Sequence, residues 1–448
     1  MEKRLQQYQQ RLEKDLVLSP VSKKLFKEIS DTNISRKIVA LYVMAPVMCM
    51  YVLWVLKEAI QSGKNKLYFL ARDGYSMYQV AKVFCEQLNL PIECKYLYCS
   101  RYAWRQAEYH LMGEECLNYI CLGGIDVTLQ KVMHRAGLTD EEGRRMAALL
   151  QKEEEYQKVL SYQQVKALQP ILAECIPFME LLQQRSQEKY PLVCAYLRQE
   201  GLLEGEWAVV DSGWTGSMQK SLKHILHSMG YDKKIEGYYF GMYEYPKGVE
   251  EANYHGWYFR PKKGIRRKVH FSNSLFECIF SSLEGMTLGY EKQGEDYVPV
   301  LESSKSPNLE KITKSTEYLQ KYAQQLSEVY GAELLHKLRT DGKMAYSLLY
   351  EFMGKPTVEE AFEYGGYVFC DDVIGEAAQR VAAPLTYQEI KDNRLLYKAV
   401  NFLRKKGNVV HESAWLEGSI MLCPEAGAGE LWHCKAYKYV LYIRKLLK

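Results

Sequence analysis

Two short apolar runs, each followed by charged or small residues, constrain the fold of this chain most. Lys66–Ala71 (KLYFLA) precedes Arg72-Asp73-Gly74, and Trp207–Val210 (WAVV) precedes Asp211. Apolar runs of this length without polar alternation are typical of strands that are covered on both faces of a parallel sheet. A helical spacing follows each run. The sequence therefore predicts an α/β protein with a parallel sheet whose strands are joined by helices.

The rest of the chain divides by pattern into four parts. We predict a helical lead-in over residues 1–37, an α/β core over 38–103 and 201–300, and a helical insertion over 104–200, rich in Glu, Gln, Lys and Leu. Residues 301–448 form a helix-rich C-terminal region. Within the core, Lys95–Cys99 and Ile235–Met242 are further predicted strands, and 253–290 shows a strand-like aromatic alternation.

An uncharged stretch of 19 residues, Ile38–Leu56, has nearly the length of a membrane span. Pro46, several Tyr and Met residues, and the amphipathic continuation KEAIQSGK favour a buried core helix instead, kinked or started near Pro46. Membrane contact is the alternative interpretation.

Composition excludes several classes of protein. There are 59 Lys and Arg against 55 Asp and Glu, a formal charge of +4 over 448 residues, and this does not indicate a nucleic-acid binder. Twelve cysteines occur without any CxxC pair, which favours free cytosolic thiols over a zinc or disulfide framework. The N-terminus is charged and lacks the apolar segment of a secretory signal. We therefore expect a cytoplasmic protein.

We predict a loop over Asp211–Ser217, after the WAVV strand, and this loop has the residues of a sugar-phosphate site. Asp211 is placed to accept hydrogen bonds from sugar hydroxyls, and the glycines that follow allow a ligand to approach the backbone closely. The start of the next helix, with its hydroxyl side chains, suits a phosphate. The candidate ligand-binding residues here are Ser212, Gly213, Trp214, Thr215, Gly216 and Ser217. The alternative is a tight strand-to-helix turn capped by Ser or Thr.

The segment after KLYFLA supplies the complementary charges. Arg72 can bind a phosphate through two parallel hydrogen bonds, and Asp73, beside Gly74, can orient Arg72 or hold Mg²⁺ between phosphates. Ser100 and Arg101 close the Lys95–Cys99 strand and form a third candidate segment. Because the carboxyl ends of parallel strands meet at one edge of a sheet, we expect the three segments to converge.

Two acidic residues and a basic run lie further along the chain. Glu277, or Glu284 seven residues later, can act as the general base for an acceptor hydroxyl; a glutamate in a surface salt bridge is the alternative. The basic run Lys262–Lys268 can contact an anionic lipid-linked acceptor or the inner face of a membrane, or be a solvated loop.

Two motifs carry a resemblance to a known fold. VVDSGWTGSMQKSL resembles the phosphate-binding signature of phosphoribosyltransferases, and FLARDG resembles their pyrophosphate-contacting loop. The signature usually has two adjacent acidic residues, whereas Ser212 follows Asp211 here, and the segment is about one residue shorter. The order of these motifs, with GYYFG and SLFE, is similar to the phosphoribosyltransferase-like domain of bacterial surface-polysaccharide biosynthesis proteins. The distinctive part covers about residues 35–290.

This resemblance implies a glycosyltransferase-type activity with Mg²⁺ as cofactor. It implies transfer of a 5-phosphoribosyl group from phosphoribosyl pyrophosphate to a glycan or lipid-linked glycan in capsule or O-antigen synthesis. Such domains are often fused to a haloacid-dehalogenase-type phosphatase, but this chain contains no Asp-x-Asp motif, so a separate phosphatase is expected. The alternatives are a non-catalytic donor-binding scaffold, or a hydrolase with an unrecognised site.

Overall fold

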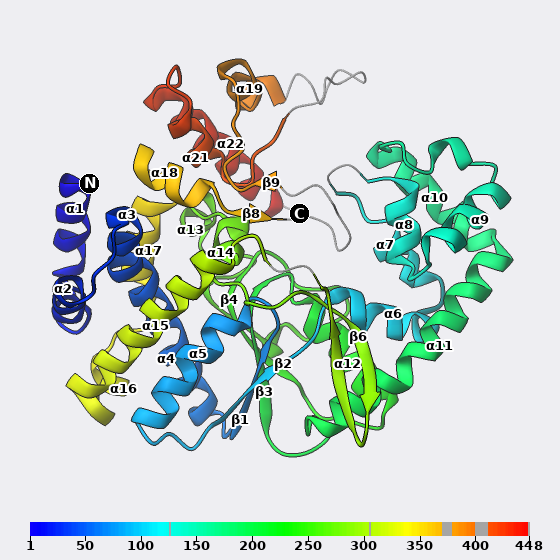
Figure 1. Cartoon of the computed structure of the whole chain (residues 1–448), viewed down its shortest axis with the longest axis horizontal. Coiled ribbons are helices and arrows are strands. Elements are labelled where there is room, and N and C mark those ends of the chain that lie inside the picture. Colours follow the sequence, from blue (N-terminus) through cyan, green and yellow to red (C-terminus); the bar gives the residue numbers. More distant parts are fainter. Residues whose placement is uncertain (125–126, 304–305, 370–378, 399–410, 447–448) are drawn as a thin grey trace.

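A five-stranded parallel sheet forms the centre of the molecule (Figure 1). The computed structural model describes residues 1–448 except 125–126, 304–305, 370–378, 399–410 and 447–448. The strands lie in the order β2-β1-β3-β4-β5, and every neighbouring pair is parallel. They are β1 (Lys66–Leu70), β2 (Glu93–Leu97), β3 (Trp207–Trp214), β4 (Glu236–Met242) and β5 (Tyr254–Phe259). The predicted α/β class with a parallel sheet is confirmed.

Both faces of the sheet are buried, which explains why its strands lack polar alternation. Leu67 and Phe69 of β1 join one hydrophobic cluster, whereas Tyr68 and Leu70 join another. All four side chains are at most 1% exposed. Helices α4 (Ala45–Gln61), α5 (Gly74–Gln87) and α15 (Leu309–Tyr330) pack together on the first side. The second side is covered by α6 (Arg101–Met112), α11 (Ile176–Gln199) and α12 (Ser217–Ser228).

The segment between β2 and β3 is helical, as its composition predicts, and extends to one side of the sheet (Figure 1). A separate cluster of buried apolar side chains, from Tyr109 to Leu182, gives it a core of its own. Besides α6 and α11 it contains α7 (Leu117–Ile120), α8 (Leu129–Arg135), α9 (Asp140–Leu149) and α10 (Tyr162–Glu174).

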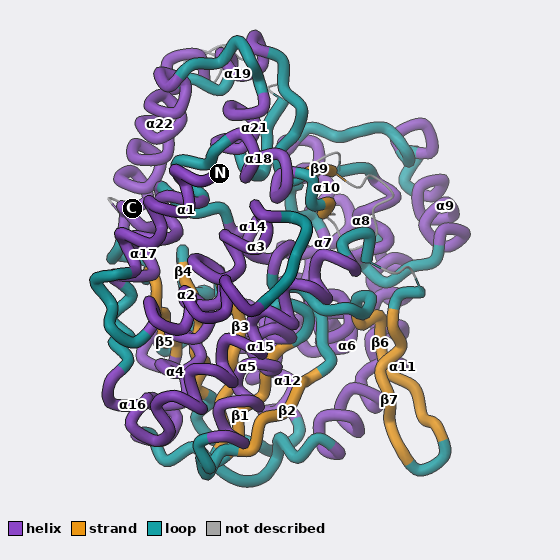
Figure 2. Tube along the Cα trace, turned by 60° about the vertical axis from the view of Figure 1, so that its left-hand side comes forward, coloured by secondary structure: helices purple, strands orange, loops and turns teal. Residues whose placement is uncertain are grey.

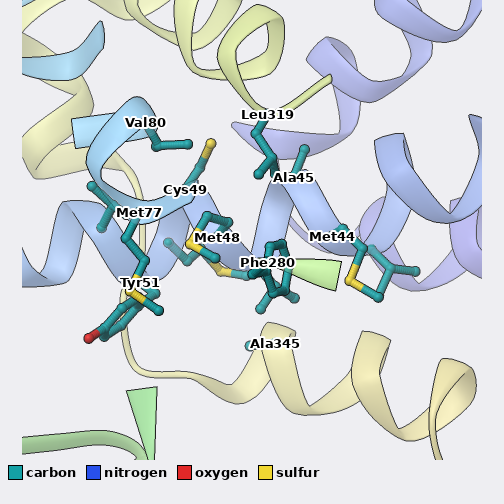
Figure 3. Close-up of a cluster of buried hydrophobic side chains, with 14 of the residues drawn as sticks. Met44, Ala45, Met48, Cys49, Tyr51, Met77, Val80, Phe280, Leu319 and Ala345 are labelled. Atoms are coloured by element: carbon teal, nitrogen blue, oxygen red, sulfur yellow. The ribbon is translucent and has the colours of Figure 1, made fainter. Parts of the chain in front are cut away.

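The apolar stretch 38–56 is a core helix. It lies within the helical segment Ile34–Gln61, which is long and apolar enough to cross a membrane, but whose apolar window is completely buried inside the protein. A π-helical turn, Ala40–Met44, precedes α4 within this segment, and Pro46, which has no N–H to donate, follows it closely. Figure 3 shows side chains of α4 packed among those of α5, α15 and α17. The preference for a core helix over membrane contact is therefore confirmed in the fold.

Two sequence-based predictions are corrected. The segment 211–217, expected to be a loop, continues β3 as far as Trp214, because Asp211, Gly213 and Trp214 all pair with β4. Only two residues separate β3 from α12. The strand-like pattern predicted over 253–290 holds for β5 and for the start of β6, but two short helices lie between them, α13 (Ile265–Val269) and α14 (Asn273–Ile279). The Ser272 side chain caps α14 by accepting a hydrogen bond from the Leu275 N–H, and this favours helix over strand.

Past α14 the chain adds a hairpin beside the sheet and then a set of helices, several of which lie above the sheet (Figure 2). The hairpin consists of β6 (Thr287–Gln293) and β7 (Asp296–Leu301). The other described elements are α16 (Leu334–Lys337), α17 (Lys343–Phe352), α18 (Val358–Gly365), β8 (Val368–Phe369), β9 (Gln379–Arg380), α19 (Tyr387–Asp392), α21 (Leu416–Leu422) and α22 (Ala428–Leu446).

A buried ion-pair network ties the N-terminal helices to this region. The N-terminal helices are α1 (Glu2–Leu12), α2 (Leu18–Glu28) and α3 (Ile34–Val39). Arg4 of α1 contacts Glu360 at 2.8 Å and Glu351 at 3.2 Å, and its guanidinium also donates to the Glu351 carbonyl at 2.6 Å. The Arg4 and Glu360 side chains are only 4% and 0% exposed. The Tyr8 hydroxyl donates to Glu360 at 2.6 Å, so the network is hydrogen-bonded as well as charged.

We expect Arg4→Ala to lower the free energy of unfolding by about 3–5 kcal/mol, because it leaves a buried carboxylate without its partner. The matched control is Lys23→Ala, which breaks an exposed pair with Glu13 at 2.8 Å and is expected to cost less than ~1 kcal/mol. Denaturant unfolding of both variants provides the measurement. Equal losses would show that the N-terminal helix is not held by this network.

Candidate active site

The strand order changes direction between β1 and β3, and in open parallel sheets such a switch point forms a crevice. From β1 the chain continues to β2 on one side, whereas β3 is followed by β4 and β5 on the other. In open parallel sheets ligands bind outside the carboxyl ends of the strands at such a switch point. Phe69 of β1 pairs with Val210 of β3, so the residues that follow these two positions lie at the same edge. The two segments singled out from the sequence meet there.

A direct hydrogen bond joins the two segments. The Ser212 hydroxyl donates to Asp73 Oδ2 at 2.5 Å. Asp73 is half-buried and comes immediately before α5, whereas Arg72 is exposed. Burial raises the pKa of Asp73, and the Ser212 hydrogen bond and the charges of Arg72 and Arg101 oppose that shift. Both arginines therefore lie close enough to stabilise the Asp73 carboxylate.

Asp211 lies deeper in the same crevice. Its side chain is 8% exposed, and its Oδ1 accepts the Ser212 N–H at 2.8 Å. Burial, followed by the nearby Asp73 charge, raises the pKa of Asp211 well above its usual range. The Tyr51 hydroxyl of α4 lies 3.0 Å from the backbone carbonyl oxygens of both Asp211 and Tyr238. The core helix thus fixes the backbone that presents Asp211.

Glu277 of α14 brings a third carboxyl group to this cluster. Its Oε1 accepts the indole N–H of Trp214 at 2.5 Å. Burial and the Asp73 charge raise the pKa of Glu277 to about 7, against the Trp214 hydrogen bond and the Arg101 and Arg72 charges. A carboxyl group with such a pKa can take up or release a proton near neutral pH. Three acidic and two basic side chains therefore interact at one edge of the sheet.

The glycines after Asp211 serve the packing of the protein itself. At Gly213, with φ of +130°, an added Cβ would lie 2.0 Å from the carbonyl oxygen of Gly241 on the neighbouring strand. At Gly216, with φ of +63°, a Cβ would lie 2.7 Å from the Tyr254 ring. Both positions require glycine whether or not a ligand is bound. The sequence-based reason for these glycines, close approach of a ligand, is therefore not needed to explain them.

Trp214, a candidate for binding the sugar, is half-buried and packs against aromatic rings. Its ring centroid lies 5.3–6.1 Å from those of Tyr243, Phe259, Phe271 and Phe276. Its nearest polar partner is Glu277. In this structure Trp214 orients Glu277, a role that the sequence alone did not indicate because the two residues are far apart in the chain.

The remaining candidate residues differ in their exposure and in whether the fold already uses their polar groups. The Ser100 hydroxyl caps α6 by accepting the Ala103 N–H at 2.9 Å and donates to the Thr287 carbonyl at 2.6 Å, so the fold already uses it. Gly74 packs tightly on β1, since an added Cβ would lie 3.0 Å from Phe69. Arg101 is exposed, and Thr215 and Ser217 are half-buried at the start of α12.

The Mg²⁺ site expected at Asp73 stays a prediction. Within the described ranges no group of three or more His, Cys, Asp or Glu side chains is placed to hold a metal ion. Mg²⁺ is commonly held by one or two carboxylates together with substrate phosphates and water, so a protein cage is not required. Asp73, half-buried beside two arginines, provides one such carboxylate.

Part of the basic run 262–268 is used in hydrogen bonds within the protein, and part is exposed. Arg267 donates to the Tyr258 carbonyl at 2.7 Å, and the buried Lys268 donates to the Pro261 carbonyl at 2.6 Å. Burial lowers the pKa of Lys268 to about 8. Lys262, Lys263 and Arg266 remain exposed, so the basic surface is smaller than the sequence suggests.

Comparison with known proteins assigns the chain to no family: no protein-family model matches it, and no curated protein is significantly similar. The function must therefore be argued from the site.

We expect the charge of Glu277 to make stability depend on pH. Its pKa is raised from 4.5 to about 7 in the folded protein. The stabilisation associated with this shift is fully present below the unfolded pKa and is lost as the pH rises through the folded pKa. Between pH 5 and pH 8 the wild type should lose up to ~3 kcal/mol of unfolding free energy that Glu277→Gln retains.

Urea unfolding at several pH values tests this expectation, with the exposed Glu291→Gln as the matched control. A pH dependence that Glu277→Gln leaves unchanged would place the Glu277 carboxyl outside the buried cluster.

Proposed function

We propose that this protein transfers a 5-phosphoribosyl group from phosphoribosyl pyrophosphate to a carbohydrate acceptor in bacterial polysaccharide biosynthesis. The observation that carries the proposal is the convergence of Arg72, Asp73, Asp211 and Glu277 at the β1/β3 switch point. A phosphoribosyltransferase-like arrangement of the sheet is part of this proposal. Its support comes from the two sequence motifs and from the meeting of their residues at one edge.

The donor would lie across the crevice. Arg72 and Arg101 are exposed at the ends of two neighbouring strands and would bind the pyrophosphate, since a planar guanidinium matches phosphate oxygens. Asp211 would accept hydrogen bonds from the ribose hydroxyls. Thr215, Ser217 and the first N–H groups of α12 would hold the 5-phosphate. Asp73 would hold Mg²⁺, which when bound would offset charge on the pyrophosphate.

The proposed reaction needs no covalent intermediate with the protein. The bond from ribose C1 to the pyrophosphate oxygen breaks, and its electron pair leaves with the pyrophosphate. The acceptor hydroxyl oxygen bonds to C1, and its proton passes to Glu277, whose pKa of about 7 suits a general base. Arg72 stabilises the charge that grows on the leaving group.

The partners and location follow from this chemistry. The product would keep its 5-phosphate, and a separate phosphatase would remove it. We propose a cytoplasmic enzyme that works near the inner face of the membrane, where a lipid-linked acceptor would be located. The exposed Lys262, Lys263 and Arg266 would give weak, salt-sensitive attraction to anionic lipid.

We expect Arg72→Lys and Asp211→Asn to fail in different ways. Arg72→Lys keeps the charge but loses the two-pronged geometry, so turnover should fall about 10²-fold while affinity for ribose 5-phosphate changes little. Asp211→Asn should weaken both the donor and ribose 5-phosphate by about tenfold or more, because the amide replaces an acceptor of two hydroxyl protons. Gly216 is unsuitable for such a test, since any side chain there meets Tyr254.

Calorimetric titration with phosphoribosyl pyrophosphate and Mg²⁺, and assays of pyrophosphate and orthophosphate release, provide the measurements. Arg145→Lys on the exposed face of α9 is the matched control. Donor binding without pyrophosphate release for any acceptor would favour a non-catalytic scaffold. Orthophosphate release would favour a phosphatase. Normal turnover in both variants would remove the active site from this crevice.

We also expect the protein to leave cell membranes without detergent, because its one candidate spanning segment in the described chain is fully buried. Fractionation of cells in low and high salt tests this. Release by salt would support contact through the exposed basic residues, whereas a requirement for detergent would contradict the buried state of α4.

A further inference from the structure

A cleft lined by tyrosines lies beside the candidate active site. Its volume is about 420 Å³, within the range of small-molecule sites. Tyr75 and Tyr78 of α5 form one wall, and Tyr96 and Tyr98, on and just after β2, form another. Glu284, from the segment between α14 and β6, also lines the cleft. The other lining residues are Cys94, Lys95, Glu200 and Leu283. Nothing in the proposed donor site uses these side chains.

The cleft and the crevice share their backbone segments. The Tyr75 N–H donates to the Arg72 carbonyl at 3.1 Å, so this wall begins where the donor loop ends. Ala71 N–H donates to the Leu97 carbonyl at 3.0 Å, which sets the end of β2 against the same loop. Tyr98 is three residues before Arg101. Neither Arg72 nor Arg101 lines the cleft itself, but the segments that form its walls lead directly to both arginines.

The ring of Tyr96 joins the other three tyrosines into one aromatic group, which we call the tyrosine row. The Tyr96 ring contacts the other three, with centroid distances of 5.7 Å to Tyr75, 5.9 Å to Tyr78 and 5.1 Å to Tyr98. The contacts with Tyr75 and Tyr98 are edge-to-face. All four side chains are half-buried, so each keeps part of its surface exposed. Such a row offers an amphipathic wall with apolar ring surface and hydroxyl groups side by side.

The polar groups of the cleft suit hydroxyl donors. Burial, followed by the neighbouring Glu284 carboxylate, raises the pKa of Tyr98. Glu284 is itself exposed, and a carboxylate accepts hydrogen bonds from several hydroxyls. Glu200 and Lys95 also line the cleft, and the Lys95 ammonium lies 3.6 Å from the Glu200 carboxylate. Two carboxylates against one lysine give the lining a net negative charge, which disfavours a phosphate or another anion. A ring that has both an apolar face and hydroxyl groups matches this lining, and a pyranoside has both.

We propose that this cleft is the acceptor subsite and binds a neutral pyranoside ring against the tyrosine row, with Glu284 accepting hydrogen bonds from its hydroxyls. This inference rests on the proposed function for its role in the reaction, although the sugar binding itself can be tested without the donor. The inference gives different roles to the two glutamates that the sequence offered as general base: Glu277 belongs to the reacting centre, and Glu284 binds the acceptor.

Three methyl glycosides serve as probes: methyl β-glucopyranoside, methyl β-galactopyranoside and methyl β-N-acetylglucosaminide, with choline as a cationic competitor. Saturation-transfer difference NMR on the wild-type full chain should show binding of at least one glycoside. Tyr78→Leu keeps apolar volume but removes the ring, and Glu284→Gln removes the charge. Each should weaken that glycoside about tenfold. Tyr162→Leu, at a tyrosine that is 65% exposed on α10, is the matched control and should bind like the wild type.

Failure of this inference is distinguishable from failure of the proposed function. Absence of binding by all three glycosides, equal binding in the cleft variants and the control, or displacement of the glycoside by choline at lower concentration would each overturn the acceptor subsite. Thermal unfolding of each variant shows whether it is folded, and Tyr98→Phe, which removes only a hydroxyl, gives a milder second test of the Glu284 contact. Titration with phosphoribosyl pyrophosphate on the same samples reports the donor site independently: glycoside binding without donor binding would keep the cleft as a sugar site and reject the transferase.

Discussion

The packing of helix α4 is the constraint on which the rest of the structure depends. A helix that is apolar on all sides must be covered on all sides, by a membrane or by protein. Here α5, the sheet, α15 and α17 provide that cover, and these elements come from distant parts of the chain. The C-terminal region is consequently part of the fold of the α/β core. The same packing directs Tyr51 to the backbone of Asp211, so the most buried helix also supports the candidate site.

Electrostatics at the carboxyl edge of the sheet follow from three carboxyl groups in one small volume. Burial raises the pKa values of Asp73, Asp211 and Glu277, and the Asp73 charge adds to the shift at the other two. Ser212 limits the shift at Asp73 and Asp211, Trp214 limits it at Glu277, and Arg72 and Arg101 limit it at Asp73 and Glu277. A cluster of this kind costs stability unless something cationic or hydrogen-bonding joins it. Perturbed carboxyl groups at a topological switch point are a common property of sites that bind ligands and transfer protons.

Sequence patterns predicted the parts of the fold that depend on local periodicity. KLYFLA and IEGYYFGM were correctly interpreted as buried strands, and 38–56 as a core helix. The extent of β3 was wrong, because pairing with β4 continues the strand through residues with turn-like character. The aromatic pattern over 265–279 wrongly predicted strands. The aromatic side chains there are buried in the core, and residues in helices can be buried in the same way.

Only part of the candidate site could be predicted from the sequence. Arg72, Asp73 and Asp211 follow apolar strands, and strand ends converge in a parallel sheet, so their meeting was foreseeable. The partnership of Glu277 with Trp214, and the bond from Ser212 to Asp73, depend on contacts between distant segments that no spacing encodes. The tyrosine cleft could not be predicted either. The composition shows an abundance of tyrosine, but it is the packing of α5 against β2 that brings four of them together.

The distance along the chain between α4 and its cover has a consequence for synthesis on the ribosome. Helix α4 ends at Gln61, but α15 begins at Leu309 and α17 at Lys343. At a synthesis rate of about 5–20 residues per second, α17 emerges on the order of 15–60 s after α4, so part of the apolar surface of α4 stays uncovered for that time. During that interval the nascent chain presents a segment that resembles a membrane span in length and hydropathy. Until then, the cover that the chain itself can supply comes from elements synthesised earlier, such as α5.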